Sequence, residues 1–301
     1  MKCRNCGAEF ESRFCPECGT RAVVEAEGRQ TVEKERGAEK PEYYLSEADS
    51  KETKGKIKVL MCRNGKEEKQ ISVQSEQSVL DFCESKKYVF YVQQIENNLF
   101  NIFMTISRAG KINLYRYAKA TGKTEQLTIK GDGYNWPGSI HCTEEYLLLF
   151  YQDDDMDEKL LLMNTDGKRM RHIDAEELDV DELCNISIVG FYDNCIWYQD
   201  TEEETLFVYR VDTDTAKKIS SNVSLAASDE NNVYYLREDD CDYEAVRCSI
   251  EGKDRTIIGR VETSLSVTAL TVENGKPVVW AKRRGSYLAA EEKTKVEIKA
   301  L

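Results

Sequence analysis

From residue 41 onward the chain alternates short apolar runs with short polar stretches. The apolar runs are rich in aromatic and β-branched side chains, which is typical of strands about four to eight residues long. Six of these runs recur at similar intervals: EYYL (42–45), YVFYV (88–92), YLLLFY (146–151), CIWYQ (195–199), NVYYL (232–236) and PVVWA (277–281). The pattern predicts an all-β fold made of many short strands.

Each of these runs belongs to a unit of similar composition. A polar stretch follows, then a second apolar strand such as INLYRY (112–117) or KLLLMN (159–164), and then a tight turn. Glycine adopts the positive φ that such a hairpin turn needs. It occupies the matching turn in four units: Gly65, Gly122, Gly167 and Gly252.

A repeat of about 40–55 residues that contains only short strands is the pattern of a propeller blade. We therefore expect a six-bladed β-propeller over residues 41–301. Its first unit lacks an inner strand, and its second contains an insertion that we expect to form an extended hairpin. The six units are 41–73, 76–131, 134–174, 180–221, 223–260 and 262–301.

A bundle of helices is the competing fold. It would need apolar residues at three- and four-residue spacing over about ten or more positions. Only DAEELDVDEL (174–183) approaches this spacing. We expect that segment to be one short helix or an acidic loop within the all-β fold.

The first residues of the chain have a different pattern, which is dominated by cysteine. Cys3 and Cys6 form one Cys-x-x-Cys pair, and Cys15 and Cys18 form a second. Two such turns can place four thiolates around one ion, at about 2.3 Å for Zn²⁺. Because four thiolates leave no open coordination position, we predict one structural zinc ion and not a catalytic metal.

Other uses of these cysteines stay open from the residues alone. A thioredoxin-like redox pair would need a βαβ context, which the pattern lacks. A rubredoxin-type iron site uses similar pairs, usually with a longer gap between them. Nucleic-acid contact is a further alternative, although residues 1–22 contain only four basic residues against three acidic ones, a weak basic signal.

Between the cysteines and the strands lies VVEAEGRQTVEKERGAEK (23–40), which is nearly all charged or small. A stretch with so little to bury is typical of a flexible linker. We therefore predict a zinc ribbon over 1–22, a flexible charged linker over 23–40 and the propeller over 41–301.

Two resemblances accompany this organisation. Residues 1–22, with CPECG as the second knuckle, resemble the short zinc ribbons that begin many bacterial proteins. The aromatic strand, the L-Y-R strand and the Gly-Lys turn resemble bacterial six-bladed propellers of unknown function, related to TolB-type and low-density-lipoprotein-receptor-type propellers. The resemblance implies no activity. Members often have a membrane span between ribbon and propeller, and this sequence has none there.

Charge and composition narrow the range of partners. The 301 residues have a formal net charge of −13, so the chain as a whole is repelled by nucleic acid and by anionic membranes. The run YLLLFY (146–151) is too short to span a bilayer, and the first residues have no apolar stretch of the kind a signal peptide needs. With the odd number of 11 cysteines, these features lead us to expect a reducing, cytoplasmic setting.

Catalysis in a propeller would need side chains that converge on the innermost strands. The chain has two histidines, His141 and His172. His141 stands beside Cys142, but neighbours on a strand point to opposite faces, so no Cys–His dyad is expected. We expect no catalytic residue and a non-enzymatic interaction module or scaffold. A propeller hydrolase that uses a channel metal or a cysteine is the alternative.

The connections between the second and third strands of the units are repeatedly acidic. In a propeller these connections lie on one face, which would attract a basic protein or peptide. The alternative is that hairpin tips are simply polar. The candidate partner-binding residues are Asp153, Asp154, Asp155, Asp157, Glu202, Glu203, Glu204, Asp239 and Asp240.

Overall fold

The computed structural model describes residues 41–50, 56–75, 77–94, 113–127, 136–153, 157–168, 170–239, 242–261, 266–282 and 294–299. The chain divides into two compact units, Met1–Pro41 and Glu42–Leu301. The predicted zinc ribbon and linker lie outside the described residues, and the strands all belong to the second unit.

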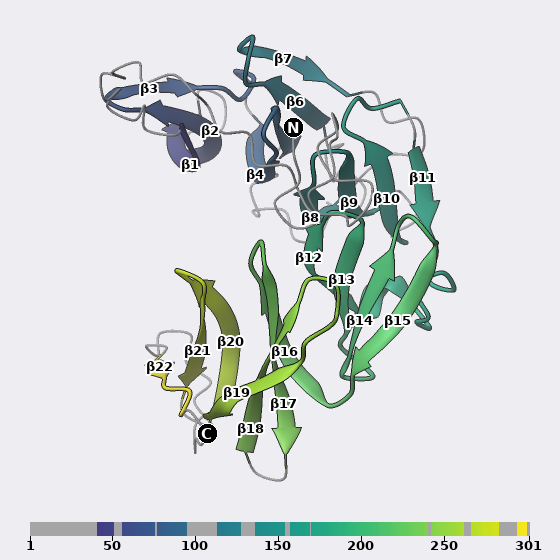
Figure 1. Cartoon of the computed structure of the whole chain (residues 1–301). Coiled ribbons are helices and arrows are strands. Elements are labelled where there is room, and N and C mark those ends of the chain that lie inside the picture. Colours follow the sequence, from purple (N-terminus) through teal and green to yellow (C-terminus); the bar gives the residue numbers. More distant parts are fainter. Residues whose placement is uncertain are drawn as a thin grey trace, which may run out of the picture. The chain divides into compact units, whose positions relative to one another are not determined.

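The described residues form six antiparallel sheets, and each sheet consists of strands that follow one another along the chain (Figure 1). The first sheet contains β1 (Glu42–Asp49), β2 (Lys56–Asn64) and β3 (Glu67–Gln70). The second contains β4 (Ser78–Glu84), β5 (Tyr88–Gln94), β6 (Asn113–Ala118) and β7 (Lys123–Gln126). The third contains β8 (Trp136–Cys142), β9 (Tyr146–Gln152), β10 (Glu158–Asn164) and β11 (Met170–Ile173).

The remaining three sheets repeat this arrangement. The fourth contains β12 (Ile186–Tyr192), β13 (Cys195–Asp200), β14 (Thr205–Arg210) and β15 (Thr215–Ser220). The fifth contains β16 (Val223–Ser228), β17 (Asn232–Asp239), β18 (Asp242–Ser249) and β19 (Thr256–Val261). The sixth contains β20 (Ser266–Glu273), β21 (Lys276–Lys282) and β22 (Thr294–Val296). The six sheets follow the six units predicted from the sequence, with β19 ending one residue past its unit, and the all-β prediction is confirmed.

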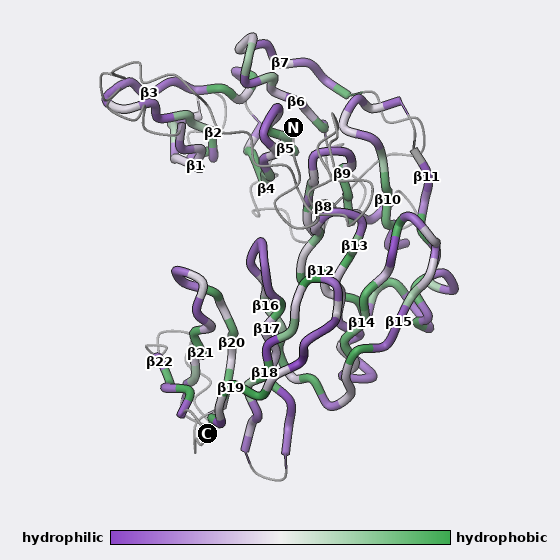
Figure 2. The backbone as a smooth tube through the Cα atoms, in the orientation of Figure 1, coloured by the Kyte–Doolittle hydropathy of each residue, from purple (hydrophilic) through white to green (hydrophobic). Residues whose placement is uncertain are grey.

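The middle strands of each sheet are apolar because neighbouring sheets cover both of their faces. Every residue of β13 is buried, whereas the outer strand β15 is largely exposed. Figure 2 shows the same contrast, with hydrophobic segments on central strands and hydrophilic turns. The buried side chains gather between successive sheets; for example, Trp197 of the fourth sheet packs in one cluster with Val233 and Tyr235 of the fifth.

The first strand of each sheet from the second to the sixth lies against a strand of the preceding sheet. Contacts link β4 to β8, β8 to β12, β12 to β16 and β16 to β20, and β4 also contacts β2, the middle strand of the first sheet. The same five sheets, from the second to the sixth, each have a register shift between their first and second strands. Because such a bulge increases local twist, its repetition gives these sheets a common twisted form.

Several local expectations can be compared with the structure. The four predicted turn glycines have positive φ, from 61° at Gly65 to 74° at Gly167, which confirms the turns. Residues 174–183 do not form an α-helix: they make turns that lead into a single 3₁₀ turn, η1 (Leu183–Asn185). The first sheet has three strands, as its missing inner strand predicted. The insertion of the second unit lies outside the described residues.

The described residues contain no helix with the length and apolar character that a membrane span requires.

Candidate functional site

The β9–β10 connection contains two of the predicted acidic residues in described positions, and they differ in role. Asp153 is buried, and its Oδ1 accepts the backbone N–H of Asp157 at 3.0 Å. Lys159 Nζ lies 3.4 Å from a carboxylate oxygen of each aspartate. Asp153 therefore holds the connection together, while Asp157 is exposed at the surface beside its partner Lys159. Asp154 and Asp155 lie outside the described residues.

The β13–β14 turn presents three consecutive glutamates. Asp200 is buried beneath the turn, and its Oδ1 accepts the backbone N–H groups of Glu202 and Glu203, each at 3.0 Å. Asn185 Nδ2 donates to Glu202 Oε2 at 2.5 Å. These bonds fix the turn, so the exposed side chains of Glu203 and Glu204 project from a well-ordered support.

Backbone hydrogen bonds connect the β13–β14 turn of the fourth sheet to the fifth sheet. The backbone N–H of Val223 donates to the carbonyl oxygen of Glu204 at 2.7 Å, and that of Glu238 donates to the carbonyl oxygen of Asn222 at 2.9 Å. On the other side, β10 of the third sheet contacts η1, whose Asn185 binds Glu202. Carboxylates from three sheets therefore share one end of the structure. The acidic end consists of Asp157, Glu202, Glu203, Glu204 and Glu238.

Asp239 is not part of a free loop. It lies at the end of β17, and its carboxylate is 3.1 Å from Arg260 Nη2 on β19. Arg260 Nη2 also contacts the buried Glu244 at 3.2 Å, and Glu244 pairs with Arg237 as well. The hydrogen bond from Arg237 lowers the pKa of Glu244 below its ordinary value, against the effect of burial. Asp239 is thus neutralised by an arginine, and Asp240 lies outside the described residues.

A polar pocket of about 480 Å³ lies beside this network, between β15 and β17. Its lining includes the uncharged Ser221 and charged residues of both signs: Lys218, Arg237, Glu238, Asp239 and Arg255. Arg255 is anchored by its Nη1, which donates to the carbonyl oxygen of Ile219 at 2.5 Å. The pocket suits a polar group with paired charges, such as a charged side chain of a bound peptide.

We expect Glu244→Gln to destabilise the protein in a pH-dependent way. The lowered pKa of Glu244 in the folded state means that its carboxylate contributes stability above its ordinary pKa of 4.5, and that this contribution is lost as pH falls through the lowered value. At pH 7 the variant should lose about 1–3 kcal/mol of unfolding free energy, since two arginines lose a charged partner.

Urea unfolding at neutral pH and below pH 4 measures this effect. The gap between the variant and the wild type should shrink in acid, where the wild-type carboxyl is protonated. The matched control is Glu251→Gln, which removes an exposed carboxylate paired with Lys253 in the β18–β19 turn and should change stability little. An equal difference in unfolding free energy at both pH values would contradict the stabilising role assigned to the ionised Glu244 carboxylate.

The two histidines do not meet each other or a thiol in a catalytic arrangement. His172 Nε2 is 3.0 Å from Tyr151 Oη. His141 Nε2 is buried and has no hydrogen-bond partner among the described residues, and burial lowers its pKa while Asp81 opposes the shift. Cys142, its neighbour on β8, instead packs into the core between the second and third sheets. Within the described ranges, no three His, Cys, Asp or Glu side chains are grouped to hold a metal ion.

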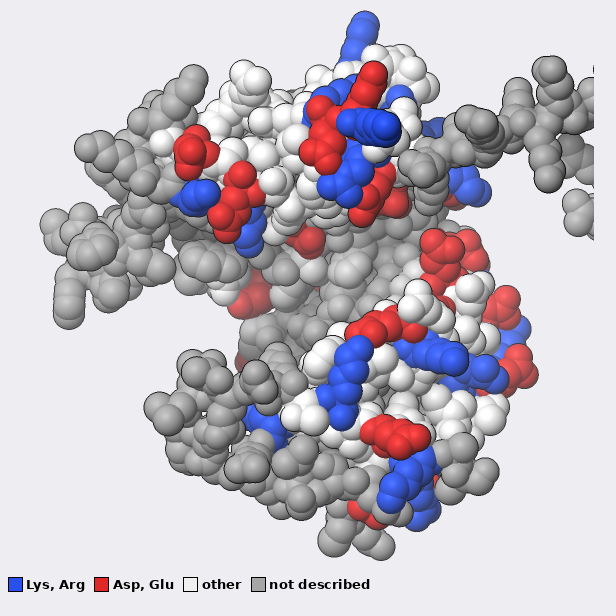
Figure 3. Space-filling model, turned by 90° about the vertical axis from the view of Figure 1, so that its left-hand side faces the viewer, with Lys and Arg blue, Asp and Glu red and all other residues white. Residues whose placement is uncertain are grey.

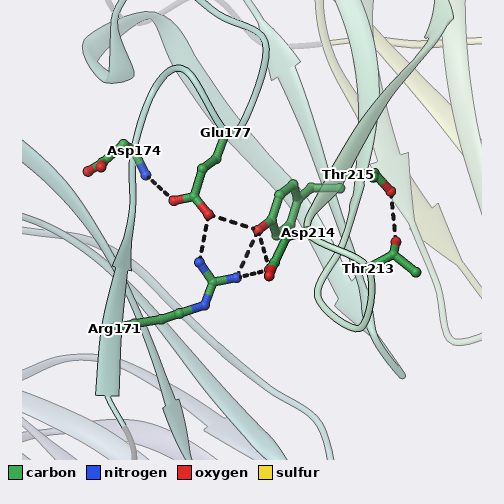
Figure 4. Close-up of polar contacts among 7 residues, drawn as sticks. Arg171, Asp174, Glu177, Thr213, Asp214 and Thr215 are labelled. Carbon is green, nitrogen blue, oxygen red and sulfur yellow. Dashed lines mark hydrogen bonds and ion pairs between the residues drawn. The ribbon is translucent and has the colours of Figure 1, made fainter.

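A second charged cluster joins the outer strands of the third and fourth sheets. Arg171 of β11 lies between Glu177 and Asp214, as Figure 4 shows, with its Nη1 2.8 Å from Glu177 Oε1. The Tyr209 hydroxyl lies 2.8 Å from Arg171 Nη2 and donates to Asp214 Oδ1 at 2.9 Å. Each charge has a partner of opposite sign, so we interpret the cluster as a structural link between sheets.

Pairing of opposite charges is also visible on the surface. On the face drawn in Figure 3, Asp and Glu side chains lie beside Lys and Arg in small groups. A carboxylate therefore matters for binding mainly where no basic residue of the chain neutralises it.

Sequence reasoning missed the basic residues of the site. Arg237 faces Glu244 across the β17–β18 pair, and Glu244 faces Arg260 across the β18–β19 pair. These three residues are neighbours only because of strand register. Folding the β17–β18 hairpin back on itself at the Asp239–Asp242 connection could have suggested the pairing of Arg237 with Glu244, but nothing local indicates the pairing of Glu244 with Arg260.

Comparisons with known proteins support the fold. No protein-family model matches the sequence, and no curated protein matches it either. Among solved structures, acylaminoacyl peptidase in complex with Z-Gly-Gly-Phe-chloromethyl ketone has a TM-score of 0.52 at 11% identity, over 80% of this chain and 41% of that chain. Oligogalacturonate lyase in complex with manganese has a TM-score of 0.50 at 12% identity, over 81% of this chain and 72% of that chain.

TolB from Acinetobacter baumannii has a TM-score of 0.44 at 13% identity, over 75% of this chain and 57% of that chain. The peptidase and the lyase are of the propeller type. At such low identity the likeness to the peptidase and the lyase shows the fold alone. The described part of the chain therefore has a β-propeller-like, all-β fold.

Proposed function

We propose that the chain is a protein-interaction module: a six-bladed β-propeller whose acidic end binds a basic segment of a partner protein. A flexible linker joins this propeller to an N-terminal zinc ribbon that has a structural role. The observation that carries the proposal is the acidic end itself, where exposed carboxylates from three sheets are held on rigid supports.

Rigidity of the support is the first argument. Asp200 fixes the β13–β14 turn through two backbone N–H groups, and the turn is tied to the next sheet through Val223. Gln199 Nε2 adds a buried bond to the carbonyl oxygen of Val223 at 2.5 Å. A site that is ordered before binding loses less conformational entropy when a partner docks.

The placement of charge is the second argument. Arg237 and Arg260, which lie in the same sheet as Glu238, are engaged with Glu244 and Asp239. The exposed side chains of Glu203, Glu204 and Glu238 are thus left to face solvent and a partner. Such a surface attracts basic groups and speeds their approach. The pocket beside it, which contains Lys218, adds a position for a carboxylate of the same partner.

The acidic end can be tested with an arginine-rich peptide carrying a fluorophore. The triple variant Glu203→Gln, Glu204→Gln, Glu238→Gln should bind this peptide about 3- to 150-fold more weakly at low salt, because three exposed ion pairs of about 0.2–1 kcal/mol each are lost. Its association rate should also depend less steeply on salt than that of the wild type.

A control with the same change in charge separates position from net charge. Glu145, Glu230 and Glu251 lie in exposed turns at the opposite ends of the strands, so the triple variant Glu145→Gln, Glu230→Gln, Glu251→Gln serves this purpose. It should retain most of the wild-type affinity. Equal losses of peptide affinity in the two triple variants would refute the proposal for the acidic end. So would an association rate of the Glu203, Glu204 and Glu238 variant that depends on salt as steeply as that of the wild type.

A further inference from the structure

The first strands of the second and third sheets, β4 and β8, run side by side in the same direction. Within both strands, the backbone N–H of Ile140 donates to Asp81 Oδ2 at 3.1 Å. Just beyond the C-terminal ends of both strands, the backbone N–H of Lys86 donates to Glu144 Oε1 at 2.8 Å. Residues of β4 therefore lie beside residues of β8 in the same order along the chain, and the difference between the two residue numbers is nearly constant.

Cys83 and Cys142 occupy corresponding positions between these two contacts. Both side chains pack against the same core cluster between the second and third sheets. Their thiols are hydrogen-bond partners of each other. Both residues are only partly buried. Two thiols that are far apart in the sequence are thus held in contact by the packing of two sheets.

We propose that Cys83 and Cys142 form a reversible disulfide that links the second and third sheets when the protein meets a peroxide or a small-molecule disulfide. With hydrogen peroxide, one sulfur attacks a peroxide oxygen, the O–O bond breaks, one water leaves and a sulfenic acid forms. The second sulfur then attacks the first, the S–O bond breaks and the hydroxyl leaves as water. The two thiols lose two electrons and two protons, and the peroxide is reduced to two waters.

The surroundings of the pair fit a bond that forms only under an oxidising challenge. Burial and the neighbouring Cys142 raise the pKa of the Cys83 thiol well above its ordinary value. Because the thiolate is the nucleophile, this makes the pair slow to react. Once formed, the disulfide would close a long loop of chain, which restricts the unfolded state and stabilises the fold.

The other described cysteines have different surroundings. Cys184 is exposed, and its Sγ donates to Glu182 Oε2 at 3.1 Å. Cys62, Cys195 and Cys248 are buried. Cys184 is therefore the matched control, because it is more accessible to an oxidant than Cys83 but has carboxylate and amide partners in place of a thiol.

The test uses the full chain, incubated with hydrogen peroxide or with oxidised glutathione and then digested without reductant. Mass spectrometry should find the peptides of Cys83 and Cys142 linked, and dithiothreitol should separate them. The melting temperature of the oxidised protein should rise by about 5–10 °C. Cys83→Ser should abolish the linked peptides and the rise, whereas Cys184→Ser should preserve both.

The peptide map of the wild type decides the matter even where Cys83→Ser folds poorly. The proposal would be overturned if Cys83 and Cys142 were still free thiols in a sample whose Cys184 had been oxidised. It would also be overturned if either cysteine became a sulfinic acid without forming the disulfide, or if either formed a disulfide with a different cysteine of the chain.

Discussion

Replacing Cys3 and Cys18 with serine in the full chain is expected to abolish zinc binding and to leave the unfolding of residues 42–301 unchanged. Together the two substitutions remove one thiolate from each Cys-x-x-Cys pair, so neither half of a tetrahedral site stays complete. Zinc binding supplies on the order of 10 kcal/mol to the folding of such small units. Zinc content measured by atomic absorption should fall from one ion per chain to none.

The unfolding of the strands should not change on loss of zinc, since the chain divides into separate compact units at Pro41. A fragment that begins at Glu42 should give a β-rich circular dichroism spectrum and a cooperative melt. The control is Cys184→Ser, which removes an exposed thiol from the β unit and should retain the zinc. Unfolding of the strands on treatment of the wild type with a chelator would show that the two units depend on each other.

The second large effect is expected at Trp197, whose side chain is fully buried between the fourth and fifth sheets. Its Nε1–H donates to the carbonyl oxygen of Ile250 at 2.8 Å, so the ring both fills the core and joins two sheets. Trp197→Ala should cost about 3–5 kcal/mol of unfolding free energy, because it leaves a large cavity and an unpaired carbonyl group. Denaturant titration measures this loss.

Trp280→Ala is the matched control, because it makes the same chemical change at a half-buried position. Trp280 Nε1 donates to Thr271 Oγ1 at 3.0 Å, and Lys295 Nζ lies 4.9 Å from the ring centroid. Its loss should be about 1–2 kcal/mol, since less apolar surface returns to water. Similar losses in the two variants would mean that the fourth and fifth sheets do not depend on Trp197 for their packing.

Much of the fold could be predicted because burial is repeated along the chain. The strands that the sequence revealed best, such as β9 and β13, are middle strands covered on both faces, so their apolar runs are almost continuous. The turns at Gly65 and Gly167 were predictable because their backbone requires positive φ. The predicted zinc ligands likewise rest on local spacing alone.

The site was less predictable because the role of a charge depends on its partner. Asp153 and Asp200 look from the sequence like exposed members of acidic loops, yet both are buried and hold turns. Asp239 looks equally free but is paired with Arg260. A carboxylate that accepts backbone N–H groups and one that faces solvent are identical in sequence, and only the surrounding backbone distinguishes them.

By itself the sequence determined the all-β character, the six groups of strands and the cysteine pairs, since each follows from neighbours within a few residues. Strand register decided that Arg237, Glu244 and Arg260 form one network. Packing between sheets decided that Cys83 lies against Cys142 and that carboxylates from three sheets share one end. These contacts join residues that are distant along the chain, and local hydrophobic periodicity carries no information about which distant strands meet.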